Sequence, residues 1–132
     1  MAVGTTQYLN NAWLGTIKST GASFNVAAGI FAQLHTANPG ATGATAVSST
    51  TVRVAATFTS PTTGVLSSSN TPSWTSWAGT NGEVVSHISF WDIITAASGN
   101  CLWTAQLSAS KTINTGDTFT LSSSSLTITN AS

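Results

Sequence analysis

The sequence holds few side chains that could act as an acid, a base or a nucleophile. Those that could do so are Glu83, Asp92, Asp117, Cys101, His35 and His87. A Cys, a His and an Asp could together support nucleophilic catalysis. No catalytic motif surrounds Cys101, however, and Cys is commonly a small buried hydrophobic residue. We therefore expect a protein that is not an enzyme and has no catalytic residue.

The three carboxylates do not suggest the converging pair that acid–base enzymes use. Glu83 and Asp117 each follow a glycine in a turn-like segment, so both are expected to be solvated or capping groups. Asp92 follows an apolar run, where burial of an unpaired carboxylate would be costly. Arg53, the only arginine, is one possible structural partner for Asp92. The alternative, in which the two do not pair, stays open.

Signatures of metals and cofactors are also missing from the sequence. The two histidines lie far apart, without a spaced Cys or His that would complete a ligand set. Neither the P-loop spacing nor the dinucleotide-binding spacing of glycines occurs. We therefore expect no metal and no cofactor.

The composition excludes several classes of partner. Charged residues make up 5% of the 132 residues and the formal net charge is zero, against roughly 25% charged residues in an average domain. Three basic residues cannot form the surface that neutralises nucleic-acid phosphates or binds anionic lipid. A neutral surface also gives little protection against self-association, which favours an ordered assembly. Ser and Thr contribute 44 residues and the hydrophobic fraction is 41%, enough for a packed core.

The chain is expected to form one domain over residues 1–132, because its length suits a single core. Its single Cys101 excludes an internal disulfide. No run approaches the roughly 18 apolar residues of a membrane span, and the first residues lack a basic segment followed by an apolar one. We therefore expect synthesis in a cytoplasm without membrane insertion.

One helix is predicted near the start of the chain, over about residues 8–18. Leu9, Trp13 and Ile17 are spaced by four residues, which places them on one helical face. Residues 19–23 are expected to end this helix.

The remainder is typical of β-strands. Strands are predicted at 29–35, at 52–58, at 84–94, at 101–107 and in the tail over 119–128. The runs 84–94 and 101–107 should pair as an antiparallel hairpin. In the first of them, Val84 is expected to share a face with Ile88 and Phe90, and Val85 to lie on the other face. Alternation in the 52–58 run puts Arg53 opposite the buried side.

About six to eight strands and one short helix favour a mainly β fold. An antiparallel β-sandwich, a jelly-roll-like fold and a closed barrel all suit this spacing of 8 to 12 residues, and the strand count does not separate them. Thr is β-branched and suits exposed strand faces, while Ser and Asn supply turns.

The five tryptophans allow two interpretations, core packing or contact with a sugar or partner. Trp91 and Trp103 lie in apolar strands and Trp13 on the apolar helix face, which favours the interior. Trp74 and Trp77 lie in a segment rich in Ser, Thr, Pro and Gly. These two rings, together with Arg53, are the candidate interface residues, since Trp and Arg are enriched at interface hot spots.

The order of several short segments resembles a family of small tailed-phage virion proteins, often labelled phage tail fibre or structural proteins. The segments are FAQLHTANPG at 31–40, VRVAATF at 52–58, VSHISFWD at 85–92, AASGNCLW at 96–103 and GDTF at 116–119. The resemblance covers about residues 8–128. It implies an antiparallel β fold and a non-enzymatic role in a virion.

Three hypotheses follow. The first is a capsid decoration, or cement, protein on the outer surface of a phage head, a homotrimer whose partners are its own copies and the major capsid protein. The absence of a coiled-coil or collagen-like stalk favours it. The second is a tail-fibre, baseplate or receptor-binding module whose partners are tail proteins or host glycans, with Trp74, Trp77 and the Ser/Thr-rich loops contacting the glycans. The third, a small hydrolase that uses Cys101 or His87, lacks the required polar constellation.

Overall fold

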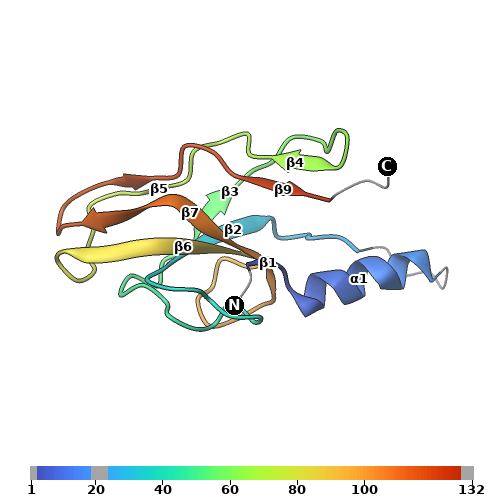
Figure 1. Cartoon of the computed structure of the whole chain (residues 1–132), viewed down its shortest axis with the longest axis horizontal. Helices are drawn as coiled ribbons and strands as arrows, with labels where there is room; N and C mark the ends of the chain where they lie inside the picture. The colour runs from blue at the N-terminus through green and yellow to red at the C-terminus, as the bar shows by residue number, and fades with distance from the viewer. Residues whose placement is uncertain (1–2, 19–23, 129–132) are drawn as a thin grey trace.

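The computed structural model describes residues 3–18 and 24–128, and it shows a β-sandwich with one helix at its end (Figure 1). The mainly β fold with a short N-terminal helix is therefore confirmed, and of the three β architectures it is the sandwich. The expected end of the helix, at 19–23, lies outside the described residues. In chain order the elements are β1 (Gly4–Thr5), α1 (Gln7–Ile17), β2 (Ile30–His35), β3 (Val54–Ala56), β4 (Val65–Ser67), β5 (Ser73–Trp74), β6 (Glu83–Trp91), β7 (Cys101–Ile113), β8 (Phe119–Thr120) and β9 (Ser125–Thr127).

The first layer is a five-stranded sheet in the order β1-β7-β6-β2-β3, in which all neighbours are antiparallel. The predicted hairpin is confirmed, because β6 pairs with β7. Its first strand is shorter than predicted, since β6 ends at Trp91 and residues 92–100 form a connecting loop. Its second strand is longer and reaches Ile113.

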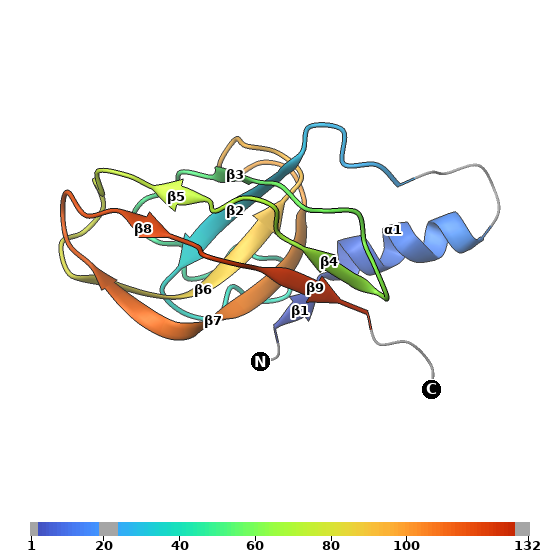
Figure 2. The same cartoon turned by 90° about the horizontal axis from the view of Figure 1, so that it is seen from above.

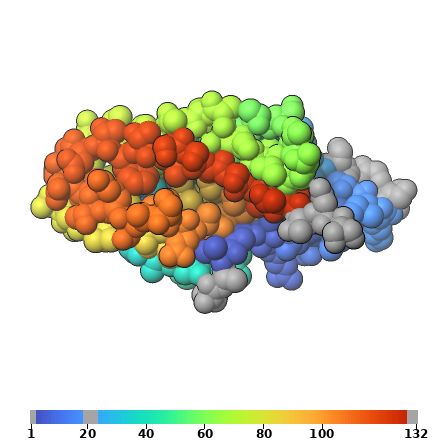
Figure 3. Space-filling model, turned by 45° about the horizontal axis from the view of Figure 1, so that its top comes forward, coloured from blue at the N-terminus to red at the C-terminus, as the bar shows by residue number. Residues whose placement is uncertain are grey.

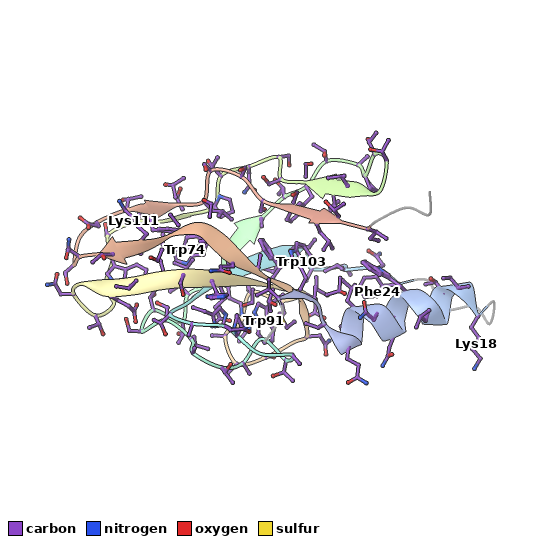
Figure 4. The ribbon with its side chains drawn as sticks, viewed as in Figure 1. Lys18, Phe24, Trp74, Trp91, Trp103 and Lys111 are labelled. Atoms are coloured by element: carbon purple, nitrogen blue, oxygen red, sulfur yellow. The ribbon has the colours of Figure 1, made fainter. Side chains whose placement is uncertain are left out.

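Strand alternation gives the sheet two unlike faces. On the first, which we call the apolar face, lie Ala32, Leu34, Ile88, Phe90 and Trp103. On the second, which we call the polar face, lie Gln33, His35, Ser89, Trp91 and Thr104. Figure 4 shows the Trp103 and Trp91 side chains on opposite sides of the ribbon.

Two short strand pairs, β4–β9 and β5–β8, form the second layer. Seen from above, they lie across β2 and β6 (Figure 2). Their side chains pack on the apolar face and include Leu66, Trp74, Phe119 and Leu126. Between the layers the Phe90 and Trp103 rings stack with centroids 4.4 Å apart, and Phe58 meets both edge-on. Such edge-on contacts suit the charge distribution of aromatic rings.

A bulge in the β6–β7 pair changes the expected alternation. Val85 pairs with Lys111 and His87 pairs with Gln106, so β6 advances two residues while β7 advances five. The bulge turns Val85 into the core with Ile88 and Phe90, and it leaves Val84 46% exposed. The predicted faces of Val84 and Val85 are therefore wrong, because a bulge breaks the period-2 pattern.

Two loops, residues 36–50 and 92–100, cover the polar face. The first is fastened at its far end by Glu83, whose carboxylate accepts hydrogen bonds from the Ser48 hydroxyl (2.7 Å) and from the Ser49 N–H (2.9 Å). At Gly43 the loop backbone has φ +71°, and an added Cβ would collide with the side chain of Cys101. Glycine is required there both by its conformation and by this close approach.

Helix α1 begins at a Thr6 cap, whose hydroxyl oxygen accepts from the Leu9 N–H. The predicted helix is confirmed, with its bounds shifted by one residue. Only the first turn of α1 packs fully against the sandwich, because Leu9 is buried while Leu14 is 63% and Ile17 is 78% exposed. The expectation that Ile17 packs with Leu9 is wrong, since the helix extends past the end of the sandwich (Figures 1 and 2).

Candidate functional site

The structure places the candidate interface tryptophans in the interior. Trp74 is 4% and Trp77 is 2% exposed. The Trp74 indole N–H donates to the Val52 carbonyl (2.9 Å), and that of Trp77 donates to the Thr80 carbonyl (3.3 Å). The surface position expected for both rings is therefore wrong. A polar segment can bury tryptophan when the ring fills the core and its N–H reaches a backbone carbonyl.

Arg53, the third candidate interface residue, is also buried, with 3% of its surface exposed. It sits on the polar face opposite Gln33, and its Nε–H donates to the Gln33 Oε1 atom (3.0 Å). Its Nη1 atom donates to the carbonyls of Ile93, Thr95 and Ser98 at 2.8–3.0 Å. Arg53 therefore holds the 92–100 loop on the sheet and presents nothing to a partner.

The guanidinium of Arg53 also stacks on Trp91, 3.8 Å from the ring centroid. This contact supplies a cation–π attraction in a site shielded from water. Burial lowers the pKa of Arg53, and the nearby Cys101 and Asp92 oppose that change.

Asp92 takes a different partner from the one considered for it. Its carboxylate accepts from the Asn100 N–H (2.7 Å) and from the Asn100 side-chain amide (2.8 Å). The pair closes the base of the 92–100 loop. Asp92 and Arg53 therefore act on the same loop from two sides without a direct hydrogen bond between them. Asp117 caps a turn as predicted, since it accepts from the Asn114 N–H (2.9 Å).

A chain of hydrogen bonds crosses the polar face through Ser89. The Trp91 indole N–H donates to the Ser89 hydroxyl oxygen (2.7 Å), which lies 2.7 Å from the His35 Nε2 atom. The His35 Nδ1 atom lies 2.9 Å from the Thr45 carbonyl. Because a carbonyl only accepts, Nδ1 carries the proton and Nε2 accepts from Ser89 in neutral His35. Every polar group in this series of hydrogen bonds therefore has a partner.

The environment of His35 favours that neutral form. Burial lowers its pKa below the ordinary value of 6.5, and electrostatic interactions with His87 and Arg53 lower it further. The carbonyls of Thr45 and Ala46 oppose this change. His35 is thus a structural link between the sheet and the 36–50 loop.

The structure does not assemble the Cys, His and Asp triplet considered from the sequence. Cys101 pairs with Trp91 at one end of the β6–β7 ladder, whereas His87 pairs with Gln106 farther along it. Burial raises the pKa of the Cys101 thiol to about 12, so the thiolate that a nucleophile needs is scarce at neutral pH. His87 is engaged with the neighbouring Ser86 hydroxyl at 2.9 Å.

Among residues 3–18 and 24–128, no three His, Cys, Asp or Glu side chains gather as a metal-binding group. No helix in that part of the chain is both long and apolar enough to cross a membrane.

A groove of about 680 Å³ lies between β7 and the segment 118–125. Figure 3 looks onto this side, where the orange β7 and the red segment toward β9 run beside each other with a hollow between them. Sequence reasoning missed this groove. The run of four serines at 122–125 was its one visible signal, and its position across the groove from the bulged part of β7 depends on the tertiary structure.

Comparison with known proteins identifies one family. The model of a family described as podophage GP4 fiber I protein gp80 matches residues 4–129. The match spans the helix, both layers of the sandwich and the groove. No curated protein matches the chain.

Proposed function

Because the chain belongs to the podophage GP4 fiber I protein gp80 family, we propose that it is a structural subunit of a podophage tail fibre. It is a phage virion structural protein, as the sequence resemblance implies. The fibre alternative is better supported than capsid decoration, and the observation that carries it is the family match over residues 4–129. A fibre subunit and a capsid decoration protein have different neighbours in the particle, so the two alternatives can be distinguished with purified virions.

The proposed role is non-enzymatic. Its support is the state of the candidate groups, because Cys101 is buried with a raised pKa and His87 lies elsewhere on the β6–β7 ladder. Arg53, Asp92 and Glu83 are each occupied in fastening a loop. The polar groups of these side chains hold the fold together, which suits a rigid structural subunit.

The proposed partners are further copies of this chain and neighbouring tail proteins, with a homotrimer as the expected assembly. The support is helix α1, which carries no charged residue over Gln7–Ile17 and projects from the sandwich (Figure 2). Leu14 and Ile17 are both mostly exposed there. Burial of two such side chains contributes about 1.5–3 kcal/mol each, enough to favour association when several copies contribute.

The location is tested by quantitative mass spectrometry of purified virions together with antibody labelling in electron micrographs. A fibre subunit should be present in a few to a few tens of copies, with label at the tail. Hundreds of copies, with label over the head, would overturn the fibre proposal and restore capsid decoration.

The assembly is tested by light scattering of the isolated chain at micromolar concentration. The double variant Leu14→Ser/Ile17→Ser should dissociate the oligomer. The matched control is Val52→Ser/Ile94→Ser, which changes two side chains that are 58% and 56% exposed on the sandwich. A wild-type chain that is monomeric, or an oligomer that survives the helix variant, would refute assembly through α1.

A further inference from the structure

We propose that the 36–50 loop is an acid-sensitive cover on the polar face, which lifts from the sheet when neutral His35 takes up a proton. Lifting would expose Cys101 and the Trp91 ring, because the loop backbone at Gly43 lies directly against both side chains. Such a movement is a property of the single chain and is independent of its place in the virion.

The tip of this loop is held together by its own hydrogen bonds. The Thr45 N–H donates to the Pro39 carbonyl (3.0 Å), and the Gly43 N–H donates to the Gly40 carbonyl (3.2 Å). The Thr45 hydroxyl also donates to the Asn38 carbonyl (3.1 Å). The tip can therefore move away from the sheet as one piece without losing these bonds.

A strained residue connects the tip to the part of the loop that stays in place. Ala46 has φ +50°, in the left-handed region that alanine rarely adopts. Its carbonyl accepts from the Thr36 N–H (2.9 Å), and the far end of the loop is fastened by Glu83. The tip itself is tied to the sheet by His35, whose Nδ1 atom lies 2.9 Å from the Thr45 carbonyl. Ala46 is therefore the hinge and His35 is the latch.

Protonation of His35 changes the hydrogen bonds at Ser89. In neutral His35 the Nε2 atom accepts from the Ser89 hydroxyl, whose oxygen also accepts from the Trp91 indole N–H. A proton on Nε2 would make His35 a second donor to this oxygen and would leave the Ser89 hydroxyl proton without its acceptor. His35 and Ser89 are both fully buried, and an unpaired polar group is costly there.

The ionisable groups around His35 also oppose its protonation. His87 is its cross-strand neighbour on β6, and Arg53 lies on the same face beside β3. Burial lowers the pKa of His35, and electrostatic interactions with these two side chains lower it further. Residues 36–50 include no titratable side chain. The three carboxylates are engaged elsewhere, Glu83 with Ser48, Asp92 with Asn100 and Asp117 with Asn114.

Opening should therefore depend on pH in a defined direction. Because the pKa of His35 is lowered under the closed loop and ordinary once the loop is open, closure is complete above about pH 6.5 and weakens as the pH falls below it. The open population should increase by up to about tenfold per pH unit in that range. A hollow beside the tip, lined in part by Ala41, Thr42, Trp91 and Cys101, gives a small reagent its route to the thiol.

The opening is tested by the rate at which a pyridyl disulfide, which reacts with thiols in weak acid, labels Cys101. The exposed thiol of the variant Cys101→Ala/Thr51→Cys corrects for the reagent's own dependence on pH. The corrected rate should increase about fivefold to tenfold from about pH 7.5 to about pH 5.5. A corrected rate that is the same at both pH values would overturn the proposal.

Two histidine variants identify the group that responds to acid. His35→Gln has no proton to gain, so its corrected labelling rate should be independent of pH, whatever its level at neutral pH. His87→Gln is the matched control on the neighbouring strand and should keep most of the increase. An increase that is kept in His35→Gln and lost in His87→Gln would overturn the role of His35.

Amide hydrogen exchange distinguishes opening of the loop from acid unfolding of the whole chain. At about pH 5.5 the amides of residues 36–46 should lose protection while those of β6 and β7 keep theirs, because local opening leaves the sheet intact. Loss of protection in β6 and β7 together with the loop would show that the chain unfolds as a whole, and the cover would be rejected.

Discussion

The two faces of the central sheet are both buried, but by different means. The apolar face packs against β4, β5, β8 and β9 through aliphatic and aromatic side chains. The polar face is covered by two loops without strand structure over most of their length, fastened by hydrogen bonds of Arg53, His35 and Asp92. One sheet is thus stabilised by non-directional packing on one side and by paired polar groups on the other.

This difference shows how a chain with 5% charged residues uses the few that it has. A loop lacks the regular hydrogen bonds by which neighbouring strands pair the backbone groups of a sheet, so side chains must pair some of its polar groups. Arg53 supplies donors to three carbonyls of one loop, and Glu83 supplies acceptors to the other. The charged side chains therefore act mainly as internal fasteners.

Phe90→Ala should have the largest effect, because it opens a cavity beneath the stacked Trp103 ring on the apolar face. We expect the free energy of unfolding to fall by about 3–5 kcal/mol, measured by urea denaturation. Val52→Ala, at an exposed position, is the control and should change it by about 0.5 kcal/mol or less. A comparable loss in both variants would show that the apolar face does not dominate stability.

Arg53→Met should loosen the loop that covers the polar face, because the loop carbonyls and Gln33 lose their donors. The free energy of unfolding should fall by a smaller amount than in Phe90→Ala, about 2–3 kcal/mol. Hydrogen exchange should increase in residues 92–100 and little elsewhere. Arg53→Lys keeps the charge but cannot reproduce the planar fork, so it should recover only part of the loss. Full recovery by lysine would mean that charge alone fastens the loop.

The two faces should also respond differently to pH. His35 has a lowered pKa in the folded chain, so the unfolded chain takes up its proton first, and stability is complete above about pH 6.5 and falls as pH decreases below it. The slope for this group is at most about 1.4 kcal/mol per pH unit. His35→Gln should flatten this dependence, whereas Leu34→Ala, on the apolar face, should lower stability and keep the slope. If the free energy of unfolding of His35→Gln kept the same dependence on pH, His35 would not be its cause.

The smallest effect concerns Cys101, where the thiol is buried and its pKa is raised to about 12. Iodoacetamide at pH 8 should label the folded chain only as fast as it unfolds. In the variant Cys101→Ala/Thr51→Cys the thiol moves to an exposed position and should react without denaturant. Rapid labelling of Cys101 in the folded chain would show that the 36–50 loop opens readily.

The elements that sequence predicted well are those with a local period. Residues Ile30–His35 and the paired runs after Glu83 form strands because continuous or alternating apolar residues suit a covered sheet. The bulge at Val85 was invisible, since the sequence shows the residues of each strand but not how many of β7 lie opposite them. The candidate interface residues were predicted less well, because Trp74, Trp77 and Arg53 are all buried.

The sequence by itself determined the strand-rich fold, the helix near the start of the chain, the scarcity of acid–base groups and the resemblance to phage virion proteins. Those properties depend on composition, on local periodicity or on segment order. Only the tertiary structure decided that Arg53 faces inward, that His35 is linked to Ser89, and that β7 and segment 118–125 enclose a groove. Each of these joins segments distant in sequence, and whether a polar side chain is buried depends on what the rest of the chain lays over it.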